Sequence, residues 1–357
     1  MRRISRTINI GSLSIGGSNP VIVQSMTNTD TRNVKDTVAQ IKRLEEAGCE
    51  LVRVAVPDEE AAVAIREIKK YILIPLIADI HFNYRLALSS IEAGADGLRI
   101  NPGNIGSTQR VREVVNACKD RAIPIRIGVN AGSLEKNLLE KHGEVNAHAM
   151  VESALEKVKL LEDMNFTDIK ISLKASSVPL TVEAYRLIAG QVTYPLHLGI
   201  TEAGTKDRAL IKSALGLGIL LDEGIGDTLR VSLTGDPVDE VWAAYEILRG
   251  LGLRQRGVEL ISCPTCGRCE FDLIGLAEEV DRRVRSMASP LKIAVMGCVV
   301  NGPGEAREAD VGIAGGKGSG LLFRRGEIVK KLKQEELLGE LLEEIRQISG
   351  DEGGKLI

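Results

Sequence analysis

The chain has 357 residues, 44% hydrophobic and 27% charged, so it is long enough for two domains and apolar enough to give each a core. Its 46 basic and 49 acidic residues leave a net charge of -3, which excludes a generally basic nucleic-acid-binding protein. No stretch approaches the ~18 uninterrupted apolar residues of a membrane helix. The basic N-terminus also lacks the apolar run of an export signal, so we expect a cytoplasmic protein with no membrane or nucleic-acid partner.

One pattern recurs over residues 20–235, in which a short β-branched run precedes an amphipathic, helix-like stretch. The eight runs are, in chain order, 20–26, 50–56, 74–80, 96–100, 123–129, 167–173, 195–200 and 227–233. Eight strand–helix units of this total length predict an α/β protein with a (β/α)8 TIM-type barrel, which we assign to residues 1–255. A doubly wound open sheet is the alternative, although no GxGxxG motif follows the first run.

After residue 255 the pattern stops, and we predict a separate small α/β domain over 256–357. A cysteine cluster is followed there by a helix, a strand, the glycine-rich segment 314–320 and a helix-like stretch over 331–348. The lysine of the glycine-rich segment is not followed directly by Ser or Thr, as a phosphate-binding loop requires. We therefore interpret 314–320 as a plain loop or turn.

Polar residues gather where the predicted barrel strands end. In a (β/α)8 barrel these carboxyl ends surround the active site, and alternate residues of each strand point inward. The polar residues at this spacing are Arg53, Asp79, His81, Asn83, Arg99, Asn101, Arg126, Asn130, Lys170, Ser172, Lys174, His197, Glu202, Arg230 and Ser232. Several basic groups around one mouth predict an anion site, and arginine suits bidentate phosphate recognition. For any single member, an ion pair inside the barrel is the alternative.

Three cysteines, Cys263, Cys266 and Cys269, fall within seven residues, and Cys298 follows beyond one helix and one strand. Thiolates are soft ligands that select zinc, copper or iron–sulfur clusters. The overlapping CxxCxxC spacing favours an iron–sulfur cluster. Zinc is the alternative, although it usually takes two separated CxxC pairs. The other two cysteines lie in helix-like segments and are expected to be small core residues: Cys49 and Cys118.

Four motifs are specific enough to suggest a family: VQSMTNTDT at 23–31, CPTCGRCEFD at 263–272, MGCVVNGPGEA at 296–306 and DVGIAGGKG at 310–318. With them the sequence resembles the bacterial 4-hydroxy-3-methylbut-2-enyl diphosphate synthases of the non-mevalonate isoprenoid pathway. The segments ADIHFN, RINPGNIG, PIRIGVNAGS, LGITEAGT and LRVSLTGDP match the same pattern. The resemblance therefore runs through the whole chain in order.

The resemblance implies a (β/α)8 barrel followed by a small cluster-bearing domain. It also implies an oxidoreductase that carries out a two-electron reductive ring opening and dehydroxylation. The substrate 2-C-methyl-D-erythritol 2,4-cyclodiphosphate becomes (E)-4-hydroxy-3-methylbut-2-enyl diphosphate, with electrons from flavodoxin or ferredoxin. The family works as a homodimer in which the cluster domain of one chain closes over the barrel of the other.

By the same resemblance, a [4Fe-4S] cluster is held by Cys263, Cys266 and Cys298, with the carboxylate of Glu305 on the fourth iron. Cys269 departs from the family pattern, because we expect a non-ligand at its position. If Cys269 completed the cluster, every iron would be closed by thiolate and the cluster could only relay electrons. We expect Glu305 to be the fourth ligand.

The resemblance also names the residues of the barrel site. Those expected to hold the diphosphate and the rest of the substrate are Arg53, Arg99, Arg126, Asn130, Lys174, Arg230 and Ser232. Those expected near the reacting carbons are Asp79, His81 and Glu202. Glu202 is the candidate proton donor, with a structural ion pair as its alternative role.

Two other classes compete with this assignment. The first is a phosphate-binding aldolase or isomerase barrel that carries a structural zinc. The second is an iron–sulfur electron carrier with four thiolate ligands and no need for basic residues at the barrel mouth.

Overall fold

The computed structural model describes residues 2–269, 271–298, 304 and 306–350. The chain divides into two compact units, residues 1–254 and 255–357. Among the described residues, no helix is both long and apolar enough to cross a membrane.

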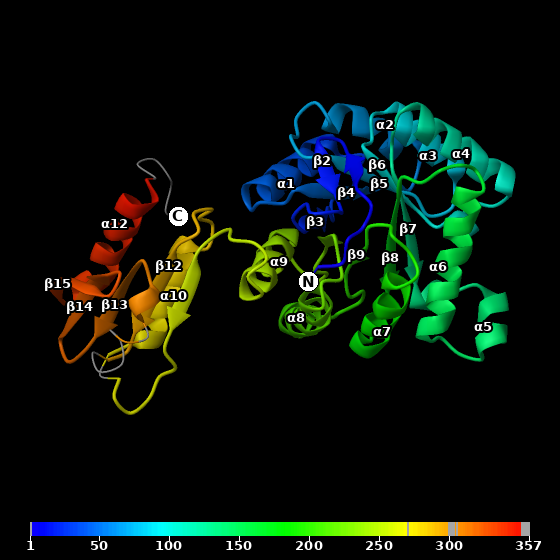
Figure 1. The fold of residues 1–357 in the computed structure, drawn as a ribbon. Coiled ribbons are helices and arrows are strands. Elements are labelled where there is room, and N and C mark those ends of the chain that lie inside the picture. Colours follow the sequence, from blue (N-terminus) through cyan, green and yellow to red (C-terminus); the bar gives the residue numbers. More distant parts are fainter. Residues whose placement is uncertain (1, 270, 299–303, 305, 351–357) are drawn as a thin grey trace. The chain divides into compact units, whose positions relative to one another are not determined.

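The first unit is a (β/α)8 barrel, as predicted, and not an open doubly wound sheet (Figure 1). Its parallel strands pair in the order β8-β7-β6-β5-β4-β3-β10-β9, and a bridge between Ile171 and Leu196 joins the two edges. The strands are β3 (Ile22–Met26), β4 (Leu51–Ala55), β5 (Leu76–Asp79), β6 (Gly97–Ile100), β7 (Ile125–Asn130), β8 (Ile169–Lys174), β9 (His197–Leu198) and β10 (Thr228–Leu229).

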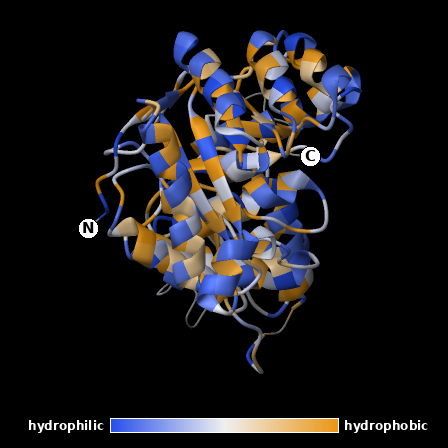
Figure 2. Cartoon of the chain, turned by 90° about the vertical axis from the view of Figure 1, so that its right-hand side faces the viewer, coloured by the Kyte–Doolittle hydropathy of each residue, from blue (hydrophilic) through white to orange (hydrophobic). Residues whose placement is uncertain are grey.

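Helices surround these strands (Figure 1), and each helix carries both hydrophilic and hydrophobic residues (Figure 2). Several begin at a residue whose side chain accepts a hydrogen bond from the first turn, as Asn33, Asp58 and Asn146 do. The helices are α1 (Val34–Glu46), α2 (Glu59–Ile68), α3 (Tyr84–Glu92), α4 (Thr108–Asp120), α5 (Lys136–His142), α6 (Ala147–Glu162), α7 (Val178–Ala189), α8 (Lys206–Asp222) and α9 (Pro237–Gly250). As predicted, Cys49 and Cys118 are buried, and burial raises the pKa of each thiol to about 12.

An N-terminal hairpin closes the amino-terminal end of the barrel. Its antiparallel strands are β1 (Ile8–Ile10) and β2 (Leu13–Ile15). It buries its isoleucines against residues at the start of β3, β4 and β5. This small core contains Ile8, Ile10, Ile15, Ile22, Leu51 and Ile77. Sequence analysis did not predict this hairpin. It leaves the opposite mouth, at the carboxyl ends of the strands, as the open end.

In the described residues, the second unit is a mixed five-stranded sheet on which α10 and α12 pack. Its first three strands run parallel and the last two are added as antiparallel hairpins. The elements are β11 (Glu259–Ser262), α10 (Leu273–Val284), β12 (Lys292–Met296), β13 (Val311–Gly315), β14 (Ser319–Arg324), β15 (Glu327–Lys333) and α12 (Leu337–Ser349).

One predicted boundary in this unit is wrong. Residues 331–333 were expected to open the last helix, but they end β15, where they pair with Ser319, Gly320 and Leu321 of β14. The helix begins only at Leu337. The glycine-rich segment 314–320 was expected to be a loop or turn, but only 316–318 form a turn, and the residues on either side of it are paired in β13 and β14.

The seam between β8 and β9 depends on one buried side chain. The Tyr185 hydroxyl of α7 donates to the carbonyl of His197 and accepts a hydrogen bond from the Leu173 N–H at 3.0 Å. β9 has only two residues, so this hydroxyl supplements a short strand pairing.

We therefore expect Tyr185→Phe to lower the free energy of unfolding by about 1–3 kcal/mol, because two buried backbone groups lose their partner. Urea unfolding followed by circular dichroism measures the change. Tyr71→Phe is the matched control, because Tyr71 is 56% exposed. Equal urea midpoints for Tyr185→Phe and the wild type would show that the seam does not need the hydroxyl.

Candidate functional site

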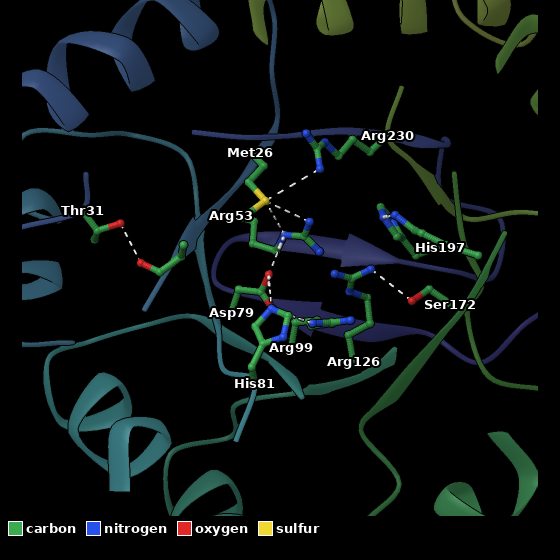
Figure 3. A network of polar contacts seen from close by, with 12 residues as sticks. Met26, Thr31, Arg53, Asp79, His81, Arg99, Arg126, Ser172, His197 and Arg230 are labelled. Atoms are coloured by element: carbon green, nitrogen blue, oxygen red, sulfur yellow. Dashed lines mark hydrogen bonds and ion pairs between the residues drawn. The ribbon is translucent and has the colours of Figure 1, made fainter. Parts of the chain in front are cut away.

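Five basic side chains, four on different barrel strands and one directly after β10, come together inside the barrel. Figure 3 shows the four arginines among them. We call the five side chains the basic ring: Arg53, Arg99, Arg126, Lys174 and Arg230. All but Arg230 are buried. The structure brings these five residues together, although Arg53 and Arg126 lie within β4 and β7 and not at the ends of these strands.

Two buried carboxylates neutralise part of the ring. Asp79, at the end of β5, accepts a hydrogen bond from Arg99 Nη1 at 3.1 Å and lies 3.6 Å from Arg53 Nε. Glu240 of α9 binds Arg230 with both oxygens, at 3.0 and 3.1 Å. Burial alone would raise the pKa of Asp79, but Arg53, a hydrogen bond with His81 and Arg99 outweigh it and hold that pKa far below its usual range. These carboxylates fix three guanidinium groups in place.

Arg126 has no carboxylate partner among the described residues. Its Nη1 donates to Ser172 Oγ at 3.1 Å, while its buried Nε and Nη2 have no hydrogen-bond partner in the described part of the chain. Burial lowers the pKa of Arg126 well below its ordinary value, and the neighbouring Arg53 and Arg99 lower it further. Buried donors are almost always satisfied in folded proteins, so these N–H groups indicate a binding site for an acceptor. An anion would supply it.

Lys174 lies against a buried histidine. Its Nζ is 3.3 Å from His197 Nε2, and His197 Nδ1 is 2.8 Å from Thr228 Oγ1. Burial lowers the pKa of Lys174 well below its ordinary value, and Arg126 adds to this effect. The pKa of His197 is also lowered by burial and by Lys174. His197 occupies an inward strand position, but strand spacing alone does not indicate its contact with Lys174.

Two glycines leave room for the ring. A Cβ atom added to Gly128 of β7 would lie 2.6 Å from Arg99 Nε, and one added to Gly199, just after β9, would lie 2.9 Å from Lys174 Nζ. Any larger residue at either position would displace a basic side chain. The glycines thus let Arg99 and Lys174 extend across the inside of the barrel.

The remaining predicted residues line the mouth more loosely. His81 has a side chain 59% exposed, with Nε2 3.3 Å from Arg99 Nη1 and 3.8 Å from Asp79 Oδ2. Asn130, at the end of β7, and Ser232, after β10, are half-buried. Glu202 is exposed and has a left-handed backbone, with φ +51°. Such strained non-glycine residues cluster at functional sites.

Sequence reasoning missed two members of this network. The sulfur of Met26 accepts hydrogen bonds from Arg53 at 2.9 and 3.2 Å and lies 3.7 Å from Arg230 Nη1. Met26 ends the first strand on the same spacing as the other inward residues, and that position could have identified it. Glu240 lies on a helix, so strand spacing could not have revealed it.

The cysteine motif lies in the second unit, next to the end of β12. Sγ of Cys263 accepts a hydrogen bond from the Gly297 N–H at 3.1 Å. A Cβ added to Gly297 would lie 3.3 Å from that sulfur and 3.2 Å from Sγ of Cys269, so both sulfurs face a glycine that leaves space for them. Cys298 follows directly in the chain. Cys266 is exposed.

Glu305, the expected fourth ligand, lies outside the described residues. Within the described part of the chain, no three His, Cys, Asp or Glu side chains form a ready metal-binding group. The donor chemistry fits a soft metal, because two thiols, those of Cys263 and Cys269, lie beside Gly297 and the sulfur of Cys263 accepts its N–H. Cys269 is the member of this pair that was expected not to be a ligand. Hydrogen bonds of this kind to ligand sulfurs tune iron–sulfur clusters.

Solved structures support the barrel fold. Dihydropteroate synthase from Stenotrophomonas maltophilia matches with a TM-score of 0.52 at 13% identity, covering 70% of this chain and 98% of that one. A truncated 3-deoxy-D-arabino-heptulosonate 7-phosphate synthase from Thermotoga maritima matches with a TM-score of 0.51 at 13% identity, covering 70% and 95%. At such low identity these similarities show the fold alone.

The sequence comparisons are more specific. Two family models match: the GcpE TIM-barrel domain over residues 5–245 and the GcpE protein C-terminal domain over residues 259–347. The 4-hydroxy-3-methylbut-2-en-1-yl diphosphate synthase (flavodoxin) of Caldanaerobacter subterraneus subsp. tengcongensis is 63% identical over 99% of both chains. The protein of the same name from Geobacter sulfurreducens is 61% identical over 98% of this chain and 99% of its own. Matches of this identity along the whole length show that the chain belongs to the GcpE family.

Proposed function

We propose that this chain converts 2-C-methyl-D-erythritol 2,4-cyclodiphosphate into (E)-4-hydroxy-3-methylbut-2-enyl diphosphate, with two electrons delivered by flavodoxin. The names of its relatives specify the product and the electron donor. The structural observation that best supports the proposal is the unpaired, buried N–H groups of Arg126 inside the basic ring. An aldolase or isomerase with structural zinc does not agree with these relatives. A simple electron carrier would have no use for the ring.

The basic ring is proposed to hold the substrate through its diphosphate. Phosphate oxygens would accept hydrogen bonds from Arg126 Nε and Nη2 and from Arg99 Nε, the other buried donor of the ring that lacks a partner in the described residues. Asp79 and Glu240 keep Arg53, Arg99 and Arg230 oriented before the substrate arrives. Prepared donors of this kind lower the barrier by positioning the reacting groups. Asn130 and Ser232 complete the proposed substrate contacts.

Glu202 is the proposed proton donor at the mouth. Glu202 is exposed, and its backbone has the left-handed conformation that is strained for a residue other than glycine. This conformation sets the direction in which its side chain leaves the backbone. Asp79 and His81 are proposed to act near the reacting carbons. Because Asp79 is buried between Arg53 and Arg99, we assign it the role of holding those two groups.

The second unit is proposed to carry a [4Fe-4S] cluster, held by Cys263, Cys266 and Cys298, with Glu305 as the fourth ligand. When bound, such a cluster supplies electrons and, at an iron not closed by thiolate, Lewis acidity toward a substrate oxygen. The Gly297 N–H donates a hydrogen bond to the sulfur of Cys263 and so orients this proposed ligand. We also propose that the chain functions as a homodimer, as the resemblance implies.

Arg126→Met tests the proposed diphosphate site. The variant removes the two unpaired N–H donors while keeping a similar apolar volume, so substrate affinity should fall by about 100-fold or more. The free energy of unfolding should stay equal or rise, because a buried charge without a partner is removed. Calorimetric titration and urea unfolding measure the two effects. Arg186→Met, at an exposed arginine paired with Glu223, is the control and should bind normally.

Glu202→Gln tests the proposed proton donor, and its expected effect is the opposite of that of Arg126→Met. It should cut turnover while leaving substrate affinity and iron content unchanged, because a proton donor is needed only for the reaction. Unchanged turnover would remove Glu202 from the mechanism. Full substrate affinity in a folded Arg126→Met variant would contradict the proposed diphosphate site.

The lowered pKa of Lys174 predicts that substrate affinity depends on pH. In the free protein its lowered pKa favours the neutral amine, whereas a bound diphosphate favours the ammonium form and raises the pKa. Substrate binding should therefore take up protons at any pH between the two values, and affinity should fall as pH rises through that window.

Titration calorimetry in two buffers of different ionisation enthalpy counts the protons taken up. Lys174→Met should take up fewer protons, whereas Lys159→Met, at an exposed lysine of α6, should match the wild type. Binding by the wild type without proton uptake would show that Lys174 is already charged before the substrate arrives.

Iron analysis separates the possible cluster ligands. After anaerobic purification we expect about four irons per chain in the wild type and in Cys269→Ser, and less in Cys266→Ser. Mössbauer spectra should show one distinct iron that Glu305→Ala abolishes and Cys269→Ser preserves. If the four irons look alike until Cys269 is replaced, the cluster is closed by thiolates and serves only as a relay.

A further inference from the structure

Two thiols of the second unit face the same glycine. A Cβ atom added to Gly297 would lie 3.3 Å from Sγ of Cys263 and 3.2 Å from Sγ of Cys269. The two sulfur atoms are therefore no farther apart than the sum of these two distances. Both cysteines are half-buried and pack against the same apolar core. Glycine at 297 lets the two thiols share this place, because a side chain there would crowd both sulfurs.

Different backbone groups hold the two sulfurs. The Gly297 N–H donates a hydrogen bond to Sγ of Cys263 at 3.1 Å. The thiol of Cys269 instead donates to the carbonyl of Phe271 at 3.3 Å. Each thiol thus has its own anchor, and neither hydrogen bond occupies the space through which the two sulfurs would approach each other.

The segment between the two cysteines can adjust. Residues 264–268 are all exposed. A hydrogen bond from the Cys269 N–H to the Cys266 carbonyl, at 2.9 Å, closes a turn that reverses the chain before Cys269. A disulfide brings its sulfurs to about 2 Å from each other, so both must move closer. Rotation about the Cα–Cβ bonds and shifts of the exposed segment supply this movement.

We propose that Cys269 is a resolving thiol for Cys263, with which it forms a disulfide when hydrogen peroxide oxidises Cys263. Peroxide first converts the Cys263 thiol to a sulfenic acid, and one water is released. The sulfur of Cys269 then attacks the sulfenic sulfur. The S–S bond forms, the S–O bond breaks, and a second water leaves with the thiol proton. Peroxide accepts the two electrons that the two thiols lose.

The disulfide preserves Cys263 as a metal ligand. Without a neighbouring thiol, a sulfenic acid is oxidised further to a sulfinic acid, which thiol reductants do not reverse. A disulfide returns to two thiols by exchange with another thiol. This role rests on the proposed cluster, because Cys263 is one of its proposed ligands. It also gives a use to Cys269, the cysteine that was expected not to bind iron.

Peptide mapping of the full-length chain tests the pairing. The cluster-loaded protein is treated with hydrogen peroxide and a chelator until its iron is released, its remaining thiols are alkylated, and it is digested with trypsin without reduction. Trypsin cuts after Arg268, so Cys263 and Cys266 stay together in peptide 257–268, while Cys269 begins the next peptide. We expect the two peptides to be joined, and fragmentation of the joined pair should place the bond at Cys263.

Two serine variants separate the cysteines. Cys266→Ser should keep the joined peptides. Cys269→Ser should lose them completely, and its Cys263 should carry two added oxygens that dithiothreitol does not remove. Cys49 and Cys118 are buried in the first unit and serve as internal controls that should remain thiols.

Other products would overturn the pairing. A bond within peptide 257–268, a bond from Cys269 to Cys266 or to Cys298, or free thiols after iron release would each contradict it. Equal amounts of sulfinic acid at Cys263 in the wild type and in Cys269→Ser would contradict the protective role.

Iron analysis of Cys263→Ser distinguishes a failure of this inference from a failure of the proposed cluster. If the wild type forms the joined peptides but Cys263→Ser keeps its full iron content, the disulfide stands and Cys263 is not a ligand. If Cys263→Ser loses iron but the wild type forms no joined peptides, the ligand stands and the resolving role of Cys269 is wrong.

Discussion

The organisation of the barrel depends on burying several positive charges inside it. Arginine and lysine groups lose hydration on burial and repel one another, and both effects favour their neutral forms or demand counter-charges. Asp79 and Glu240 supply counter-charges on two sides of the ring. Arg126 and Lys174 receive none among the described residues, and the pKa of each is lowered by burial. The proposed diphosphate would supply the missing negative charge.

Other elements of the first unit hold the strands that carry the basic ring in place. The N-terminal hairpin covers the amino-terminal end of the barrel with isoleucines. Tyr185 ties together the two strands that carry Lys174 and His197. The apolar core that surrounds the strands offsets the unfavourable burial of the ring. Stability and binding are thus divided between opposite ends of one barrel, as in other enzymes of this fold.

Much of this could be predicted from the sequence because strand spacing is a local property. Eight apolar runs revealed the barrel, and polar residues at every second position placed Arg53, Arg99 and Arg126 at its mouth. Partners contributed by other elements could not be predicted, which is why Glu240 on α9 was missed. The start of the last helix was misplaced because residues 331–333 pair with a strand, a tertiary contact that overrides local helix propensity. The backbone strain at Glu202 leaves no pattern in the sequence.

The central claim is that the basic ring is an unfilled diphosphate site. A crystal structure of the protein with 2-C-methyl-D-erythritol 2,4-cyclodiphosphate bound tests it most directly. We predict that phosphate oxygens lie within hydrogen-bond distance, about 3 Å, of Arg126 Nε and Nη2 and that Lys174 contacts the diphosphate. A substrate bound elsewhere, with the Arg126 nitrogens still unpaired, would contradict the claim.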